Sequence, residues 1–323
     1  MAVPALAGAG VIKLATFLTL LLSLTASAQT TPRSFLMVVS GIGGEAVYST
    51  VFSKWSHSLI TAAEVRMGMP REHIVYLAET DSDGADGTSH KSAVSAAIER
   101  LAARANDGDT IFLFLIGHGT ARGDRFLFNL PGPDISATEL AGMLAPHGDL
   151  RWVVINGAPS SGPFIQALSS PTRVVVTATA SAAERYHTLF PEYFIAAYAS
   201  PGADSDKNGR VSVREAFDFA KREVARSYTD KGTLLSEHAM LDDAGGLAPV
   251  SYLESDRRQY ADSIPAQELQ RLLAERSRIE EQLNSLIAIK TLYEPQVFDD
   301  RLEALLVEFA LIHRALRPAE ASQ

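Results

Sequence analysis

Apolar and polar positions follow two different periodicities along the first half of the chain. Short, nearly continuous apolar runs predict buried strands at 35–39, 73–77, 110–116, 151–155 and 173–176. Apolar residues at three- and four-residue spacings predict helices between them, for example at 48–67 and 93–105. Strands that are apolar on both faces, each followed by a helix, are typical of a parallel sheet covered by helices on both sides. The predicted fold class is therefore α/β, with a mostly parallel sheet.

The last sixty residues have a different pattern, that of two long amphipathic helices. Apolar residues repeat at three- and four-residue spacings, with Arg276 filling one position, at Leu269, Leu272, Ile279, Leu283 and Leu286 and again at Phe298, Leu302, Leu305, Phe309, Ile312 and Leu316. A break at 293–295 separates the two series. This pattern predicts a coiled-coil-like helical hairpin over residues 264–317. The hairpin either packs on its own domain or forms a homodimer, and the sequence leaves both open.

The N-terminal residues have the pattern of an export signal. Lys13 precedes the apolar run 14–24, and the small residues at 26–28 form a cleavage site before Gln29. We therefore expect a signal peptide over residues 1–28 and an exported protein, periplasmic or extracellular. The alternative is a retained membrane anchor, because residues 2–12 are also apolar and would lengthen the segment enough to span a bilayer.

Composition limits the possible partners and chemistry. The formal charge is −9, from 29 basic and 38 acidic residues, and no basic stripe with interleaved aromatic residues is present, so we expect no nucleic-acid partner. No later segment has the apolar length of a membrane span, so we expect no membrane contact after signal cleavage. The chain has no cysteine, which excludes disulfides, thiolate metal ligands and a cysteine nucleophile.

Two predicted strand ends carry the residues best suited to chemistry. The strand 110–116 is followed by Gly117-His118-Gly119, and the strand 151–155 is followed by Asn156 and the segment 157–162. In open parallel sheets, reactive groups gather at the carboxyl ends of the strands. Glycines on both sides of His118 allow a bound group to approach the backbone closely. A purely structural histidine is the alternative.

Together these segments resemble the clan CD cysteine peptidases, which include the caspases, legumain (peptidase family C13) and the catalytic subunit of GPI transamidase. In that family one strand ends in His-Gly and the next in Glu/Asp-Ala-Cys-x-Ser-Gly. The second motif aligns with Gly157-Ala158-Pro159-Ser160-Ser161-Gly162, and its cysteine position lies 41 residues after His118. The similarity continues at 177–184, 189–195 and 237–243. It implies a caspase/C13-like domain over about 33–250, and the hairpin looks like an addition found in bacterial relatives.

The resemblance implies roles for His118 as the base and for the Gly119 amide in an oxyanion hole. Pro159 occupies the nucleophile position, and proline offers neither a thiol nor an N–H. Gly157 replaces the acidic residue of the family motif. The sequence therefore predicts a caspase/legumain-like pseudo-peptidase that acts as a binding or regulatory module for a protein or peptide ligand as yet unknown.

A hydrolase of C13-like type that uses Ser160 or Ser161 with His118 is the alternative function. Both hydroxyls are displaced from the nucleophile position by one or two residues. A serine also needs stronger activation than a cysteine, normally from a base that a third group orients. The structural role for these serines would be to form the turn and to cap the following helix.

A second motif, independent of the first, matches the twelve-residue calcium loop of EF-hands over residues 204–215. Gly209 stands at the sixth position, where the loop turns sharply. The oxygen ligands would come from Asp204, Asp206, Asn208, the backbone carbonyl of Arg210, Ser212 and Glu215. The motif predicts one Ca²⁺ ion, and an Asx-rich turn without metal is the alternative. A calcium-dependent structural protein of the cell envelope is a third interpretation of the chain.

Overall fold

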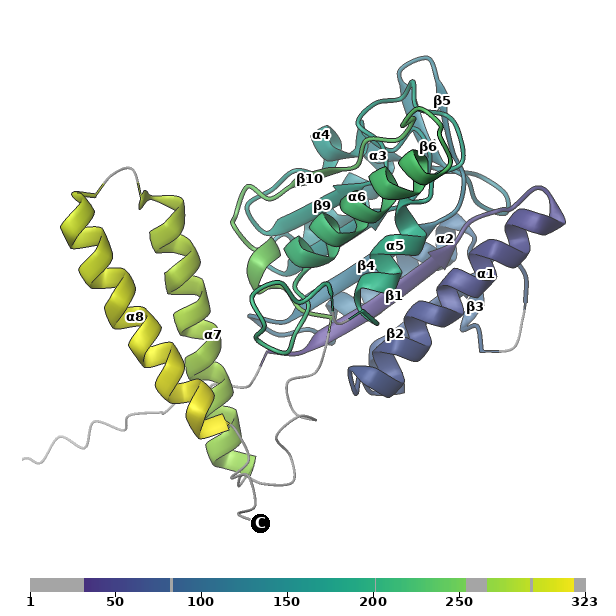
Figure 1. Cartoon of the computed structure of the whole chain (residues 1–323). Helices are drawn as coiled ribbons and strands as arrows, with labels where there is room; N and C mark the ends of the chain where they lie inside the picture. The colour runs from purple at the N-terminus through teal and green to yellow at the C-terminus, as the bar shows by residue number, and fades with distance from the viewer. Residues whose placement is uncertain (1–31, 82–83, 201, 254–265, 291–292, 317–323) are drawn as a thin grey trace, which may run out of the picture.

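A seven-stranded sheet forms the centre of the computed structural model, which describes residues 32–81, 84–200, 202–253, 266–290 and 293–316 (Figure 1). The signal peptide predicted at 1–28 lies outside these residues. The strand order is β10-β9-β8-β4-β1-β2-β3. The strands are β1 (Ser34–Ser40), β2 (Ile74–Ala78), β3 (Gly87–Thr88), β4 (Thr110–Ile116), β8 (Arg151–Asn156), β9 (Arg173–Thr177) and β10 (Met240–Asp242). Only β10 among these runs antiparallel to its neighbour, so the mostly parallel sheet is confirmed.

The two layers of helices explain why the strands are continuously apolar. In β4 all seven residues are buried. Phe112, Phe114 and Ile116 face the layer formed by α1 (Ala46–Thr61), α5 (Phe190–Ala197) and α6 (Val213–Asp230). The alternate residues of β4 face the layer formed by α2 (Lys91–Ala102), α3 (Ala137–Leu144) and α4 (Phe164–Leu168). Side chains alternate across a strand, so both faces must be apolar when both are covered.

Several short elements were not predicted from the sequence. A small antiparallel sheet follows β4 and consists of β5 (Gly119–Arg122), β6 (Arg125–Phe128) and β7 (Ile135–Ser136). The strand β10 at the edge of the large sheet was not predicted either. After α1 the chain continues as a π-helical turn, Ala62–Arg66, and three 3₁₀ turns lie at Arg71–His73, Ala145–His147 and Ala248–Val250. These segments are too short, and several too exposed, to give a clear period.

The predicted helical hairpin is confirmed as α7 (Ala266–Ala288) and α8 (Pro295–Leu316). One end of its seam is closed by Leu272, Leu273 and Leu316, with Ile312 packed against them. Figure 1 shows α7 on the side of the hairpin nearer the sheet and α8 on the outer side. Among the described residues, no helix has the length and apolar character needed to cross a bilayer.

A buried polar cluster joins α7 to the sheet domain. The guanidinium of Arg210 lies 3.5 Å from the ring centroid of Tyr252 and 3.8 Å from the carboxylate of Glu280 on α7. Arg276, placed in the seam by the heptad pattern, lies 3.6 Å from the same carboxylate. All four residues are at most 8% exposed. The 204–215 loop therefore contacts the hairpin directly through the side chain of Arg210.

Candidate functional site

His118 lies at the carboxyl end of β4, between the central sheet and β5. Its backbone carbonyl accepts a hydrogen bond from Asn129 N at 2.9 Å, which ties the β4–β5 connection to the segment after β6. Its imidazole meets Tyr48 and Phe52 of α1 edge to face, with ring centroids 4.7 Å and 5.0 Å away. Two rings at consecutive turns of one helix thus fix the orientation of the histidine.

A second imidazole, that of His187, lies beside this group and was not predicted. Its ring is nearly parallel to that of Trp55 on α1, at a centroid distance of 5.8 Å, and lies 5.3 Å from Tyr48. His187 comes from the connection between β9 and α5, far from α1 in the sequence. The only sequence signal for this contact was the four- and three-residue spacing of Tyr48, Phe52 and Trp55, which marks one face of α1.

Burial favours the neutral form of both imidazoles. Desolvation lowers the pKa of His118, although a backbone hydrogen bond at Gly43 and the charges of Glu45 and Glu79 act in the opposite direction. Desolvation also lowers the pKa of His187, and the positive form of His118 lowers it further. At neutral pH the site therefore presents two uncharged rings that can accept a proton or a hydrogen bond.

The two strand ends identified in the sequence meet at Gly119 and Pro159. A Cβ at position 119 would clash with the carbonyl oxygen of Pro159 and would approach the side chain of Ala158 to 3.2 Å. Only glycine therefore allows the two backbones to come this close. The connection after β4 and the turn after β8 are thus packed against each other at the carboxyl edge of the sheet, and residues 157–162 of that turn are buried.

Both candidate serine nucleophiles are buried and hydrogen-bonded to groups other than His118. Ser160 is 2% exposed, and its Oγ donates to the carbonyl of Ala182 at 3.1 Å. Ser161 is 1% exposed, and its Oγ lies 3.1 Å from Oγ1 of Thr179. Ser160 also has a φ of 56°, a region that costs a non-glycine residue about 1–3 kcal/mol. The serines do form the turn, but the expected helix cap is wrong, because Pro163 is the N-cap residue of α4.

The connection between β9 and α5 covers the turn after β8. Ser160 N donates to the carbonyl of Glu184 at 2.8 Å. The Glu184 carboxylate accepts from His238 N at 2.8 Å. Near α5, the carboxylate of Glu237 accepts from the backbone N–H groups of Leu189 and Phe190 at 2.9 to 3.0 Å, which satisfies the start of that helix. Segments 157–162, 180–190 and 237–238 are thus held together as one unit.

Comparison with known families identifies this arrangement. Residues 87–241 match the family model of the peptidase C13 family. The chain contains a caspase/legumain-like C13 domain. The matched segment includes His118, Gly119, Pro159 and the 204–215 loop. The C13-like domain therefore carries both candidate sites.

Two solved structures are similar to the chain at low sequence identity. One is drICE, with 9% identity, a TM-score of 0.41, and coverage of 68% of this chain and 90% of that chain. Another is the Drosophila initiator caspase Dronc, with 13% identity, a TM-score of 0.41, and coverage of 76% of this chain and 93% of that chain. The search of curated proteins found no match to the chain.

The second candidate site of the C13-like domain is the 204–215 loop, where three carboxylates converge. One oxygen each of Asp204, Asp206 and Glu215 lie within 4.8 Å of one another. The pKa of Asp206 is raised by desolvation within the loop and by the neighbouring Glu215 and Asp204 carboxylates. Oxygen donors crowded in this way suit a hard cation such as Ca²⁺. The donor set therefore fits the predicted ion.

The backbone of this loop is organised by the same side chains. Asp204 accepts hydrogen bonds from Asn208 N at 3.1 Å and Gly209 N at 2.9 Å, and Gly209 has a φ of 83°. Glu215 bonds with one oxygen to Ser205 N, at 2.8 Å, and with the other to Ser212 N, at 2.9 Å. Ser212 and Glu215 form a capping box at the start of α6. Glu215 thus joins the helix to the loop.

Proposed function

We propose that the chain is an exported C13-like protein that lacks peptidase activity and binds a protein or peptide ligand at the carboxyl edge of its sheet, as a binding or regulatory module. The observation that carries this proposal is the residue in the nucleophile position. Pro159 aligns with the cysteine of the family and lies against Gly119, the residue with the oxyanion role by resemblance. The rest of the chain contains no cysteine that could take its place.

The chemistry of the remaining groups supports catalytic silence. A thiolate paired with an imidazole is the nucleophile of this type of peptidase. Proline has no acidic hydrogen to give to His118. The Ser160 and Ser161 hydroxyls are buried and already hydrogen-bonded. A serine-dependent reaction would require at least one of these hydroxyls to leave its partner and to become accessible to a substrate.

The surroundings of His118 support a binding role. Three apolar side chains on segments next to His118 and His187 are exposed to solvent: Ile42 by 38%, Val47 by 58% and Tyr186 by 76%. Val47 precedes Tyr48 on α1, and Tyr186 precedes His187. Exposed apolar side chains on the segments that carry the two neutral imidazoles would suit a surface that contacts another chain.

Two assays on the wild-type protein test catalytic silence. A peptide library should remain uncleaved, and a serine-directed fluorophosphonate probe should leave the protein unlabelled. The Ser160→Ala and Ser161→Ala variants serve as matched controls. Cleavage or labelling that is lost in either variant, and also in His118→Ala, would show that the serine hydrolase alternative is correct.

The proposal also includes export of the protein and the binding of one Ca²⁺ ion. Export is supported by the signal-like segment 1–28, and the mature protein should have the intact mass of a chain that begins at Gln29. A retained Met1 in the purified protein would contradict cleavage. Calcium is assigned a structural role, with ligands from Asp204, Asp206, Asn208, the Arg210 carbonyl, Ser212 and Glu215.

A further inference from the structure

The predicted calcium loop is connected to the hairpin through the side chain of Arg210. Arg210 stands at the seventh position of the 204–215 loop, where only its backbone carbonyl would bind Ca²⁺. Its backbone N–H donates to Oδ1 of Asn208, a further expected ligand, at 2.8 Å. Its guanidinium lies 3.5 Å from the centroid of the Tyr252 ring and 3.8 Å from the carboxylate of Glu280 on α7. One residue therefore belongs both to the expected metal site and to the contact with the hairpin.

Tyr252 holds the same loop from the side of the sheet domain. Nδ2 of Asn208 donates to its hydroxyl at 3.4 Å. Its backbone pairs with Ser212 in an isolated bridge, and Val213 N donates to the carbonyl of Ser251 at 2.9 Å. Asn208 and Ser212 are both expected calcium ligands. Movement of the guanidinium that packs on the Tyr252 ring would therefore disturb two positions of the metal site.

Charged side chains join the hairpin to the sheet domain. Among the described residues, two ion pairs connect α7 to that domain: Arg210 with Glu280, and Arg151 with Glu281. A cleft of about 580 Å³ lies between α7 and residues 243–250, beside the second pair. Units joined by a partly open, polar contact commonly move relative to each other. The docking of α7 on the sheet domain therefore depends on these pairs.

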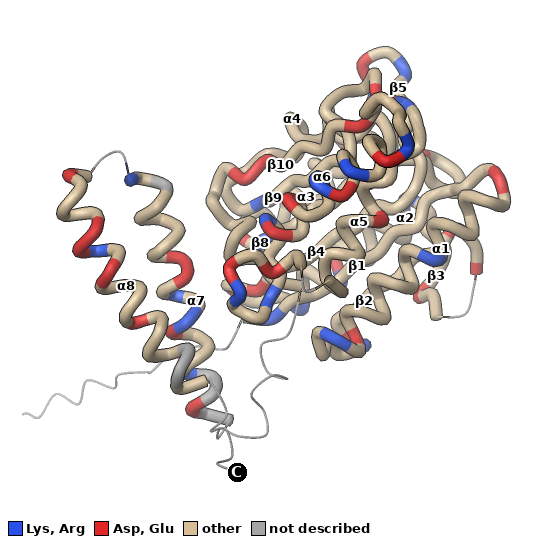
Figure 2. Tube along the Cα trace, in the orientation of Figure 1, with Lys and Arg blue, Asp and Glu red and all other residues tan. Residues whose placement is uncertain are grey.

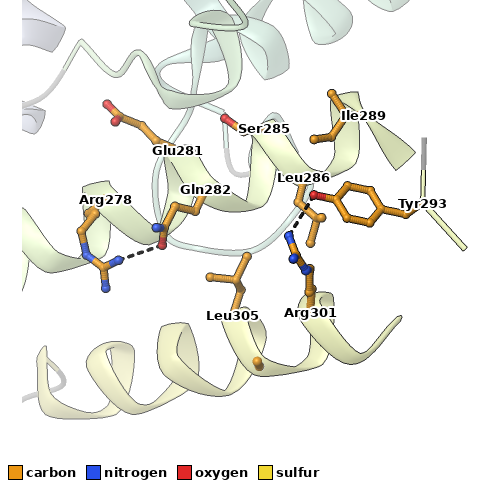
Figure 3. Close-up of a pocket in the computed structure, with 10 residues that line it drawn as sticks. Arg278, Glu281, Gln282, Ser285, Leu286, Ile289, Tyr293, Arg301 and Leu305 are labelled. Atoms are coloured by element: carbon orange, nitrogen blue, oxygen red, sulfur yellow. Dashed lines mark hydrogen bonds between the residues drawn. The ribbon is translucent and has the colours of Figure 1, made fainter. Parts of the chain in front are cut away.

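The side of α7 that contacts the sheet domain is distinct from the side that contacts α8. Figure 3 shows Leu286 and Leu305 pointing toward each other between the two helices, while Glu281 points away from α8. Figure 2 shows the charged residues of the 204–215 loop on the side of the sheet domain that is nearer α7. Separation of α7 from this loop would thus leave the contact between the two helices closed.

We propose that the hairpin regulates the calcium site through Arg210: docking of α7 raises the affinity of the 204–215 loop for Ca²⁺, and bound Ca²⁺ strengthens the docking of α7 by the same factor. This coupling rests on the calcium site of the proposed function and names the element that regulates it. The two effects are equal because two equilibria on one chain share a single coupling free energy.

Glu280 favours calcium binding in two ways that have the same sign. Its carboxylate lies near the guanidinium of Arg210, whose positive charge would otherwise oppose a cation in the loop. It also helps to fix Arg210 in place, so the loop loses less conformational freedom when it binds the ion. Removal of this carboxylate should therefore weaken calcium binding, whichever effect is the larger.

Isothermal titration calorimetry of the mature chain with Ca²⁺ measures the coupling. Glu280→Gln should raise the Kd at least about fivefold. Glu281→Gln is the matched control, because it removes the same charge from the same turn of α7 and a more exposed ion pair; it should change the Kd less than about twofold. In an Arg210→Met background, Glu280→Gln should have no further effect, because the coupling runs through the guanidinium.

The calorimetry separates failure of the coupling from failure of the calcium site. A wild type that binds no Ca²⁺ would show that the calcium site of the proposed function is wrong, and the coupling with it. A wild type that binds Ca²⁺ with a Kd that Glu280→Gln leaves unchanged would overturn the coupling alone.

Hydrogen–deuterium exchange of the wild type tests the reciprocal effect without any variant. Ca²⁺ should slow amide exchange in the part of α7 around Arg276 and Glu280 more than in α8, because only α7 contacts the loop through Arg210. Exchange rates in α7 that are the same with Ca²⁺ and with a chelator would overturn the proposal, even where calorimetry shows that Ca²⁺ binds.

Discussion

At the residue scale, the site is determined by which groups contact His118. Tyr48 and Phe52 hold its ring, and Gly119 allows its strand end to reach Pro159. The sequence predicted the strand-end position of His118, because a glycine-flanked histidine directly follows an apolar run, whereas the nucleophile position of Pro159 came from the family resemblance. It did not predict His187, because a histidine in a loop has no periodicity that would indicate its neighbour on α1.

The lowered pKa values of His118 and His187 predict how stability depends on pH. Each folded-state pKa lies below the unfolded value of about 6.5. The unfolded chain therefore binds more protons as the pH falls below about 6.5, and the free energy of unfolding should decrease there. Urea unfolding at a series of pH values should show this loss, with a smaller slope for His187→Gln.

The exposed histidine on α1 provides a control for the pH experiment. His57→Gln removes an exposed imidazole from α1 and leaves the rings around His118 and His187 unchanged. This variant should therefore keep the wild-type slope of unfolding free energy against pH. If His187→Gln keeps that slope as well, the imidazole of His187 does not contribute to the acid sensitivity of the fold.

At the element scale, two capping boxes with the same geometry begin α3 and α6. Ser136 and Glu139 cap α3, and Ser212 and Glu215 cap α6. Only the second lies in a loop where further carboxylates converge. Glu215 therefore has two roles in the proposed account, as a helix cap and as the ligand at the last position of the loop.

Calcium should stabilise the wild type and not Glu215→Gln. At a hundredfold excess of Ca²⁺ over Kd, binding to the folded state adds about 2.7 kcal/mol to the free energy of unfolding. Thermal unfolding with and without Ca²⁺ measures this gain. Glu139→Gln is the matched control: it should lose about 1 kcal/mol from its cap and keep the full response to Ca²⁺. A wild type whose melting temperature is unchanged in millimolar Ca²⁺ would show that the loop is only a turn.

Long elements were predicted more accurately than short ones, for a physical reason. The central strands are buried on both faces, so all residues of β4 after Thr110 are apolar. The α6 helix, Val213–Asp230, begins within the predicted calcium loop, where Ser212 and Glu215 form its capping box. By contrast, β5 and β6 have four residues each and are partly exposed, so their order depends on pairing with each other rather than on their own composition.

At the scale of the whole molecule, the sequence predicted two units, and the structure adds the contact between them. The hairpin follows from the heptad pattern, but the pattern placed Arg276 in the seam, whereas the structure engages it with Glu280 beside Arg210. A more exposed pair, Arg151 with Glu281 at 2.8 Å, also joins the sheet to α7. The connection predicted between the domain, which ends at about residue 250, and the hairpin, which begins at residue 264, lies mostly outside the described residues, so this boundary stays a prediction.

Substitution of two adjacent glutamates of α7 tests how much the contact between the hairpin and the sheet domain contributes to stability. Glu280→Ala removes the carboxylate that two buried guanidinium groups share, and the loss of one member of a buried ionic cluster costs about 3 kcal/mol or more. Glu281→Ala removes an exposed partner and should cost about 1 kcal/mol at most. Urea unfolding of the mature chain at one fixed protein concentration measures both. Equal losses of unfolding free energy in the two variants would contradict a buried ionic contact at Arg210.

The ionisation of a cysteine introduced at position 159 tests the central claim most directly. The claim is that Pro159 occupies the nucleophile position of a C13-like site that still has its imidazole. In Pro159→Cys, the pH dependence of iodoacetamide alkylation reports the pKa of the only thiol in the chain. We expect a pKa well below the ordinary value of about 8.5, and we expect His118→Ala in the same background to raise it again. A pKa at or above about 8.5 that does not respond to His118→Ala would contradict the account.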